Sequence, residues 1–221
     1  MASTENTART DLQPRENFSG FWHAVQLYES DAFLADSVAY FIHKGLETGC
    51  GALIIATAAH QEAIDQALRA RGADPSVARA SGQYIAIDAA ETLDQIMVDG
   101  WPDAQRFNRL VGAALWTLAE RNCSSVRAFG EMVTVLWASG RHEAALHLEK
   151  LWNSLSSRHK FSLLCAYPLN CFSGEGQAPL VLEMCSSHSH VIPAETYAKC
   201  GPATHMASRS SPPDAGLPPI A

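Results

Sequence analysis

The sequence predicts an α/β protein, a three-layer sandwich with a mostly parallel central sheet of about five or more strands. Short apolar runs alternate five times along the chain with segments of helical period. Several of these runs, such as residues 51–56, are apolar throughout, which is typical of strands covered by helices on both faces. Because parallel strands need right-handed crossovers, we expect the helices to form the two outer layers.

The predicted strands share apolar cores and lie between turn residues. They cover residues 21–28, 51–56, 83–87, 125–131 and 161–167. The fourth is central to the interpretation, because it reads Ser-Val-Arg-Ala-Phe-Gly-Glu and delivers a carboxylate, Glu131, directly after a glycine. Long helical patterns flank it on both sides, as expected for an inner strand.

Helix start and stop signals separate these strands. Ser30 and Thr57 are placed to cap the first two helices, and Pro75 opens a short third one. Helical patterns are predicted over residues 31–48, 57–71, 74 onward, 91–98, 102 onward, 132–138, 141–158 and 178–185. In residues 141–158, Ala145, Leu148, Leu151, Trp152 and Leu155 are predicted to face inward, and Glu143, Glu149 and Lys150 outward.

Length and composition indicate one soluble domain. The chain has 221 residues, 47% hydrophobic and 18% charged, which is ordinary for a globular protein. We expect a disordered segment over residues 1–19, a domain over 20–197 and a disordered Ser/Pro-rich tail over 198–221. A net charge of −7 without a basic block argues against a nucleic-acid or anionic-membrane surface. Without a membrane span or signal peptide, the expected location is the cytoplasm.

The six cysteines are scattered and contain no Cys-x-x-Cys, which predicts reduced thiols rather than a disulfide framework. Cys185 and His188 have the spacing of half a zinc site, but one half-site is a weak signal. Neither a metal nor a cofactor is therefore predicted. The tryptophans Trp101, Trp116, Trp137 and Trp152 are most simply core residues, and Trp137 could also wall an apolar pocket.

Polar and aromatic side chains follow the predicted strands. In parallel sheets, ligands bind outside the carboxyl ends of the strands. The residues at these ends are Tyr28, Glu29, Thr57, His60, Asp88, Glu131 and Tyr167. Glu131 is the strongest candidate, whereas Glu29 and Asp88 are equally well explained as helix or turn caps.

Common enzyme motifs are missing from the sequence. The first strand–helix loop, residues 28–33, holds no glycine or lysine and two acids, which argues against a phosphate-binding loop. Neither Gly-x-Gly-x-x-Gly nor Gly-x-Ser-x-Gly occurs. We therefore expect a protein that is not an enzyme.

Six short motifs, in their order and spacing, resemble the MEDS domain, the sensory domain of methanogens, methylotrophs and the dichloromethane-response regulator. They are His-Ala-Val-Gln-Leu-Tyr-Glu (23–29), Asp-Ala-Phe-Leu-Ala-Asp-Ser (31–37), Ala-Thr-Ala-Ala-His (56–60), Phe-Gly-Glu-Met (129–132) with Trp137, Leu-Trp-Asn (151–153) and Leu-Leu-Cys-Ala-Tyr-Pro (163–168). The resemblance covers residues 21–197 and implies a RecA/KaiC-like core without the Walker A loop. The family's histidine and cysteine match His23 and Cys165.

This resemblance implies a stand-alone signal-input domain that senses a small organic molecule, such as a simple hydrocarbon derivative. No output domain follows residue 197, so we expect a protein partner such as a histidine kinase or a transcription regulator, with a homodimer as one possible assembly. The expected ligand-binding residues are His23, Tyr28, Glu29, His60, Glu131, Trp137, Cys165 and Tyr167. Two alternatives stay open: a degenerate nucleotide-binding or hydrolytic protein with Glu131 as base, and a ligand-free interaction module.

Overall fold

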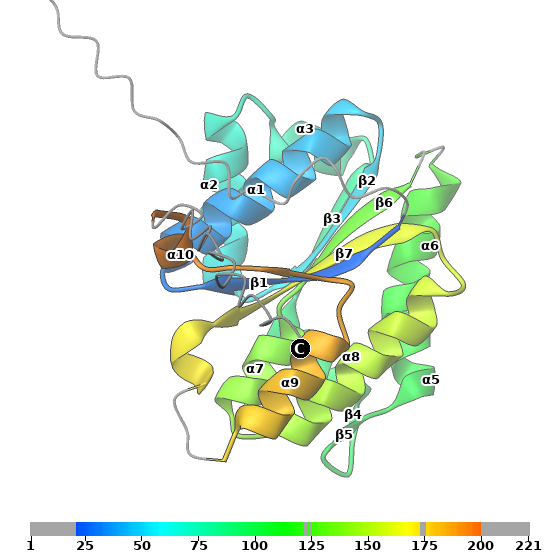
Figure 1. Cartoon of the computed structure of the whole chain (residues 1–221). Coiled ribbons are helices and arrows are strands. Elements are labelled where there is room, and N and C mark those ends of the chain that lie inside the picture. The colour runs from blue at the N-terminus through cyan, green and yellow to red at the C-terminus, as the bar shows by residue number, and fades with distance from the viewer. Residues whose placement is uncertain (1–20, 122, 124, 173–175, 200–221) are drawn as a thin grey trace, which may run out of the picture.

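In a computed structural model, the chain folds around one six-stranded sheet (Figure 1). The structure describes residues 21–121, 123, 125–172 and 176–199. The strands of this sheet are β1 (His23–Tyr28), β2 (Gly51–Ala56), β3 (Tyr84–Asp88), β6 (Val126–Gly130), β7 (Phe161–Pro168) and β8 (His190–Ile192). Their order is β3-β2-β6-β7-β1-β8, and all neighbours are parallel. The predicted α/β sandwich with a parallel sheet is confirmed, and β8 adds a strand that the sequence pattern did not predict.

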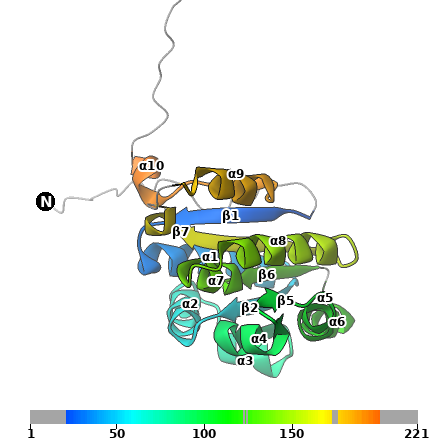
Figure 2. The ribbon, with the colours of Figure 1, turned by 90° about the horizontal axis from the view of Figure 1, so that it is seen from below.

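Helices cover both faces of the sheet, as Figures 1 and 2 show. One face packs against α1 (Asp31–Glu47), α2 (Ala58–Ala70) and α3 (Pro75–Ala80). The other packs against α4 (Ala89–Ile96), α5 (Ala104–Phe107), α6 (Ala113–Glu120), α7 (Met132–Ala138), α8 (His142–Ser156) and α9 (Ala178–Ser186). A π-helical stretch, Asn108–Gly112, joins α5 to α6, a 3-10 turn, Leu169–Phe172, follows β7, and α10 (Glu195–Lys199) follows β8.

Side-chain alternation along the strands divides the core in two. In β2, Leu53 and Ile55 join the core under α4–α9, whereas Ile54 joins the core under α1–α3. Because both faces are buried, the strand is apolar at every position. The parity of a residue along its strand therefore decides which half of the molecule it reaches, and this rule also divides the predicted site residues.

A small hairpin replaces part of the predicted helical region. β4 (Met97–Val98) and β5 (Trp101–Pro102) pair in antiparallel fashion after α4 ends at Ile96. Asp99 and Gly100 form the turn with φ of 49° and 85°, the left-handed conformation that Asp-Gly favours in tight hairpins. Pro102 consequently lies in β5 and does not open a helix. Instead, Asp103 caps α5 by accepting a hydrogen bond from the Arg106 backbone N–H.

Two of the four tryptophans predicted as core residues are exposed. Trp137 and Trp152 are buried, but Trp116 is 57% exposed and Trp101 is 48% exposed. Trp116 lies on the outward face of α6, whose neighbouring positions Leu115 and Leu118 point into the core. Trp101 lies in the hairpin, where its ring meets the His147 ring edge-on.

None of the described cysteines forms a disulfide, as predicted; they are Cys50, Cys123, Cys165, Cys171 and Cys185. The predicted disordered segments lie outside the described residues, except for residues 198 and 199, which belong to α10. Among the described helices, none combines the length and the apolar character needed to cross a bilayer.

Candidate functional site

The chain leaves two neighbouring strands in opposite directions at the carboxyl end of the sheet. After β2 it passes through α2 to β3, on one side, and after β6 it passes through α7 and α8 to β7, on the other side. The helix α2 lies on one face of the sheet, and α7 and α8 lie on the opposite face. Such a topological switch point is where open parallel sheets characteristically bind ligands.

Glu131 lies at this switch point, as the residue between β6 and α7. Its carboxylate accepts hydrogen bonds from the Thr57 backbone N–H at 2.8 Å and from the Thr57 hydroxyl at 3.2 Å. The preceding glycine gives room to the Trp152 ring, because a Cβ on Gly130 would lie 3.2 Å from it, closer than ordinary van der Waals contact. The sequence analysis predicted that the Thr57 side chain caps α2, but this side chain makes no capping hydrogen bond and binds Glu131 instead.

His60 completes this group of side chains. Its Nδ1 is 2.6 Å from the Glu131 carboxylate, and its Nε2 is 3.5 Å from the Asp31 carboxylate. The hydrogen bond to Glu131 raises the pKa of the His60 imidazole above its ordinary value, although burial opposes it, and Asp31 adds to the increase. Burial raises the pKa of the nearby Tyr28 hydroxyl, and the charges of Glu131 and Asp31 raise it further. We call Tyr28, Asp31, Thr57, His60 and Glu131 the switch-point group.

Glu29 and Asp88 are both engaged in contacts within the fold. The Asp88 carboxylate caps α4 by accepting the backbone N–H groups of Ala90 and Glu91. The Glu29 carboxylate accepts a hydrogen bond from the hydroxyl of Thr196, in α10. Capping therefore explains Asp88, and Glu29 links the end of β1 to the C-terminal segment.

The sheet separates the remaining predicted site residues from the switch-point group. In the parallel pair β1–β7, Val25 is aligned with Cys165 and Leu27 with Tyr167. Tyr28 is one position further along and faces α1, so it lies on the opposite face from Tyr167. The eight residues predicted to line one cleft are therefore divided between the two faces of the sheet.

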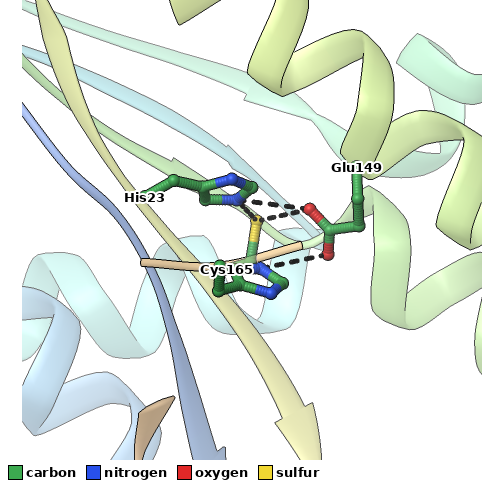
Figure 3. Close-up of side chains that lie close together, drawn as sticks. His23, Glu149 and Cys165 are labelled. Atoms are coloured by element: carbon green, nitrogen blue, oxygen red, sulfur yellow. Dashed lines mark hydrogen bonds and ion pairs between the residues drawn. The ribbon is translucent and has the colours of Figure 1, made fainter. Parts of the chain in front are cut away.

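On the α8 side, a second group of polar side chains is enclosed in the core (Figure 3). His23 begins β1, Cys165 lies within β7, Glu149 projects from α8, and His188 lies between α9 and β8. The Glu149 Oε2 atom is 3.2 Å from His23 Nε2 and 3.5 Å from Cys165 Sγ. His23 Nε2 is also 3.3 Å from Cys165 Sγ, and His188 Nε2 is 3.4 Å from Glu149 Oε1. We call these four residues the buried group.

Neighbouring groups hold the buried group in place. The Tyr167 hydroxyl donates a hydrogen bond of 2.9 Å to Glu149 Oε1. The Asn153 side chain, one helical turn after Glu149, lies 2.9 Å from His23 Nδ1, and the Met184 carbonyl oxygen lies 2.7 Å from His188 Nδ1. The two imidazole rings are thus oriented by contacts at Nδ1, and both present Nε2 to the same carboxylate.

Burial and charge perturb this group strongly. Burial raises the pKa of the Glu149 carboxyl, but the charges and hydrogen bonds of His188 and His23 outweigh it and hold this pKa well below its usual range. Burial and the Glu149 charge raise the pKa values of the Cys165 thiol and the Tyr167 hydroxyl well above their usual ranges. The resulting site contains one carboxylate, two imidazoles and a thiol with little access to solvent.

Glu149 is the functional candidate that the sequence analysis missed, and His188 was weighed there only as a weak metal-ligand signal. Glu149 was predicted to face outward, but its side chain is fully buried. The signal was present, because Glu149 follows Ala145 by four residues and precedes Trp152 by three, which places it on the apolar stripe of α8. His188 was weighed as a metal ligand with Cys165, Cys171, Cys185 and His190, of which only Cys165 belongs to the four grouped ligand residues.

Trp137 belongs to the core beside the buried group. Its ring meets the Tyr167 ring edge-on at 5.4 Å, and its indole N–H donates to the Cys171 carbonyl. A cavity of about 510 Å³ lies instead between the β4–β5 hairpin and the start of α8, lined by Gly100, Trp101, Gly140, Arg141, His142, Glu143, Ala144 and Leu180. This cavity contains none of the eight residues predicted to bind a ligand.

Comparison with known proteins identifies the family. Residues 22–189 match the model of the MEDS domain, described as the methanogen/methylotroph, DcmR sensory domain. No curated protein matches the chain. The family match covers both the switch-point group and the buried group, and it agrees with the resemblance seen in the sequence motifs. The chain therefore belongs to the MEDS family of sensory domains.

Proposed function

We propose that this chain is a cytoplasmic signal-input domain that binds a small organic molecule at the switch-point group and passes the signal to a partner protein. The observation that carries the proposal is the position of Glu131. Its buried carboxylate lies at the carboxyl ends of β2 and β6, where the chain leaves the two strands in opposite directions. Membership in a sensory-domain family supports the same role.

The chemistry of the group favours a ligand with a hydrogen-bond donor and a small apolar part. Glu131 and Asp31 offer carboxylate oxygens on either side of His60, and the Tyr28 ring is buried beside them. A hydroxyl or amine of the ligand would replace His60 as the donor to Glu131. Short alcohols, amines and halogenated alkanes are therefore the ligand classes to test. Halogenated alkanes have no hydrogen-bond donor and would bind through apolar contact alone.

The same contacts disfavour a nucleotide. At the N-terminus of α2, where a phosphate-binding helix would meet its anion, the Thr57 backbone N–H already binds the Glu131 carboxylate. Asp31 adds a second negative charge on the far side of His60. A triphosphate would have to approach two carboxylates without a lysine in the first loop.

A ligand at this point can act on the helices of both faces. Glu131 lies between the end of β6 and the start of α7. Its carboxylate binds the Thr57 backbone N–H at the start of α2, and its own backbone N–H donates to the Ile55 carbonyl in β2 at 2.8 Å. A ligand that binds better when the Glu131–His60 contact is open would shift α2 relative to α7. A histidine kinase or a transcription regulator in contact with these helices would read that shift.

Thermal unfolding with a panel of short alcohols, amines and halogenated alkanes tests the proposal. At least one compound should raise the Tm of the protein, and E131Q should lose this response while keeping the fold. The matched control is E62Q, which removes an exposed carboxylate from α2 and should respond as the parent protein does. Stabilisation that is unchanged in E131Q, or stabilisation by ATP with Mg²⁺ in place of the organic compounds, would contradict the proposal.

A further inference from the structure

The buried group has the dimensions of a metal-binding site. The ligand atoms of His23, Glu149, Cys165 and His188 all lie within 4.8 Å of one another. His23 Nε2, Cys165 Sγ and Glu149 Oε2 are 3.2, 3.3 and 3.5 Å apart, and His188 Nε2 is 3.4 Å from the other carboxylate oxygen, Glu149 Oε1. Two ligands at about 2.0–2.3 Å from a tetrahedral ion are about 3.3–3.7 Å apart. The first three atoms are therefore spaced close to neighbouring corners of such a coordination shell, and His188 lies beside them.

The His188 side chain points its Nε2 atom into this space. Its Nδ1 faces the Met184 carbonyl oxygen, which can only accept, so Nδ1 carries a proton and donates. In the neutral imidazole, Nε2 holds a lone pair directed toward the Glu149 carboxylate, 3.4 Å away. The side chain is fully buried, and Nε2 has no hydrogen-bond partner among the described residues. Either a proton on Nε2 or a metal ion between the two groups can compensate the buried Glu149 carboxylate, and a metal ion would also engage His23 and Cys165.

His23 presents the same arrangement from the opposite side. The Asn153 amide NH₂ donates to the Ser187 carbonyl at 2.9 Å, which turns the amide oxygen toward His23 Nδ1. His23 Nδ1 therefore donates to Asn153, and in the neutral imidazole its Nε2 presents a lone pair to Glu149 and Cys165. A second histidine is thus fixed in the tautomer that metal sites use, with its orienting partner at the distal nitrogen.

We propose that His23, Glu149, Cys165 and His188 bind a zinc-class divalent transition-metal ion. Two neutral imidazoles, one carboxylate and one thiolate balance the charge of a divalent ion, so the buried centre is neutral. The Cys165 thiol loses its proton to the solvent buffer when the ion binds. Imidazole and thiolate select zinc, or cobalt as its spectroscopic substitute, over calcium and magnesium.

The proposed centre goes beyond the sensing role and shares no residue with the switch-point group. Its four protein ligands and full burial are typical of a closed site that supports structure. It joins β1, β7 and α8 to the connection between α9 and β8. The Tyr167 hydroxyl and the Asn153 amide are its positioning groups, since each holds a ligand side chain and not the ion.

Cobalt titration of the full chain, freed of metal by a chelator, tests the proposal. We expect one Co²⁺ per chain, with the thiolate-to-cobalt charge-transfer band in the near ultraviolet. C165S should lose this band, and H188Q should weaken Co²⁺ binding at least about tenfold. The matched control is C185S, a free thiol on α9 outside the group, which should leave the band and the affinity unchanged.

A measurement on the unaltered protein covers the case in which a buried variant fails to fold. X-ray absorption of the zinc-loaded chain should show one sulfur at about 2.3 Å and nitrogen or oxygen ligands at about 2.0 Å. Uptake of less than one equivalent, a shell without sulfur, or a charge-transfer band that persists in a folded C165S protein would overturn the proposal. None of these readouts depends on a response to organic ligands, so failure of the proposed sensing role would not affect them.

Discussion

Both polar groups of this domain place a carboxylate beside histidine, but they satisfy it differently. At the switch point, the Glu131 oxygens receive a backbone N–H, a hydroxyl and an imidazole from the protein. In the buried group, the Nε2 atoms of His23 and His188 face the Glu149 carboxylate within the core. The first group lies at the end of the sheet, where we propose that a ligand exchanges with His60. The second group is enclosed and offers imidazole, thiol and carboxylate together, which is why we propose recognition of an organic molecule for the first and metal coordination for the second.

Removal of each carboxylate should distinguish these two environments most strongly. E149A leaves two oriented imidazoles in the core without their counter-charge, and we expect a loss of about 3–5 kcal/mol of unfolding free energy in the metal-free protein. E131A lies at the sheet end, where water can replace the carboxylate, and we expect a loss of only about 1–3 kcal/mol. Urea unfolding of both variants measures the difference. Equal losses of unfolding free energy would mean that the environment of Glu149 does not make its removal more costly than the removal of Glu131.

Zinc should stabilise the protein through the buried group alone. At a free ion concentration of about 100 times Kd, binding to the folded state adds about 2.7 kcal/mol to the unfolding free energy. The gain should be retained in E131Q and lost in E149Q, which keeps the shape of the side chain but removes a charged ligand. Thermal unfolding with buffered zinc and with a chelator measures it. A similar gain in both variants would place the zinc elsewhere.

The sequence was sufficient to predict the α/β architecture, because the periodicity of apolar residues distinguishes buried strands from amphipathic helices. Runs such as residues 51–56 and stripes such as those of α1 report burial directly, and the structure confirms the parallel sandwich that they predict. The exceptions are short elements in which few residues determine the conformation. The Asp99–Gly100 turn makes a hairpin where the pattern predicted one helix over residues 91–98 and another opening at Pro102, and β8 has only three residues paired to β1.

The candidate site was harder to predict, because it depends on the face to which each side chain points. Glu131 and His60 were both predicted, and they do meet, since both follow neighbouring strands. Tyr28 and Tyr167 were placed together at one rim, but strand parity puts them on opposite faces. Glu149 was assigned to solvent from its charge, although its position on the helical stripe indicates burial. An acidic residue on an apolar stripe is the signal to follow in such sequences.

The switch-point group should make stability depend on pH. The folded-state pKa of His60 is raised above its ordinary value of 6.5, so its contribution is fully present below about pH 6.5. The contribution is lost as the pH rises through the folded-state pKa. H60Q should therefore cost about 1 kcal/mol at low pH and less at high pH. Unfolding free energies across this range measure it, with H159Q, at the opposite end of the sheet, as control. A difference that grows with pH would contradict the protonated His60–Glu131 pair.

Removal of the Thr57 hydroxyl should give the smallest effect. In T57V the backbone N–H and His60 still bind Glu131, and only the longer contact of 3.2 Å is lost. We expect a loss of about 0.5–1 kcal/mol in urea unfolding, with T57S close to the parent protein because it keeps the hydroxyl. The helix α2 should be unaffected, since the Thr57 side chain does not cap it. A loss above about 2 kcal/mol would mean that the hydroxyl, and not the backbone, fixes the Glu131 carboxylate. The organic ligand would then have to compete with Thr57 as well as with His60, so T57V should also bind it more tightly.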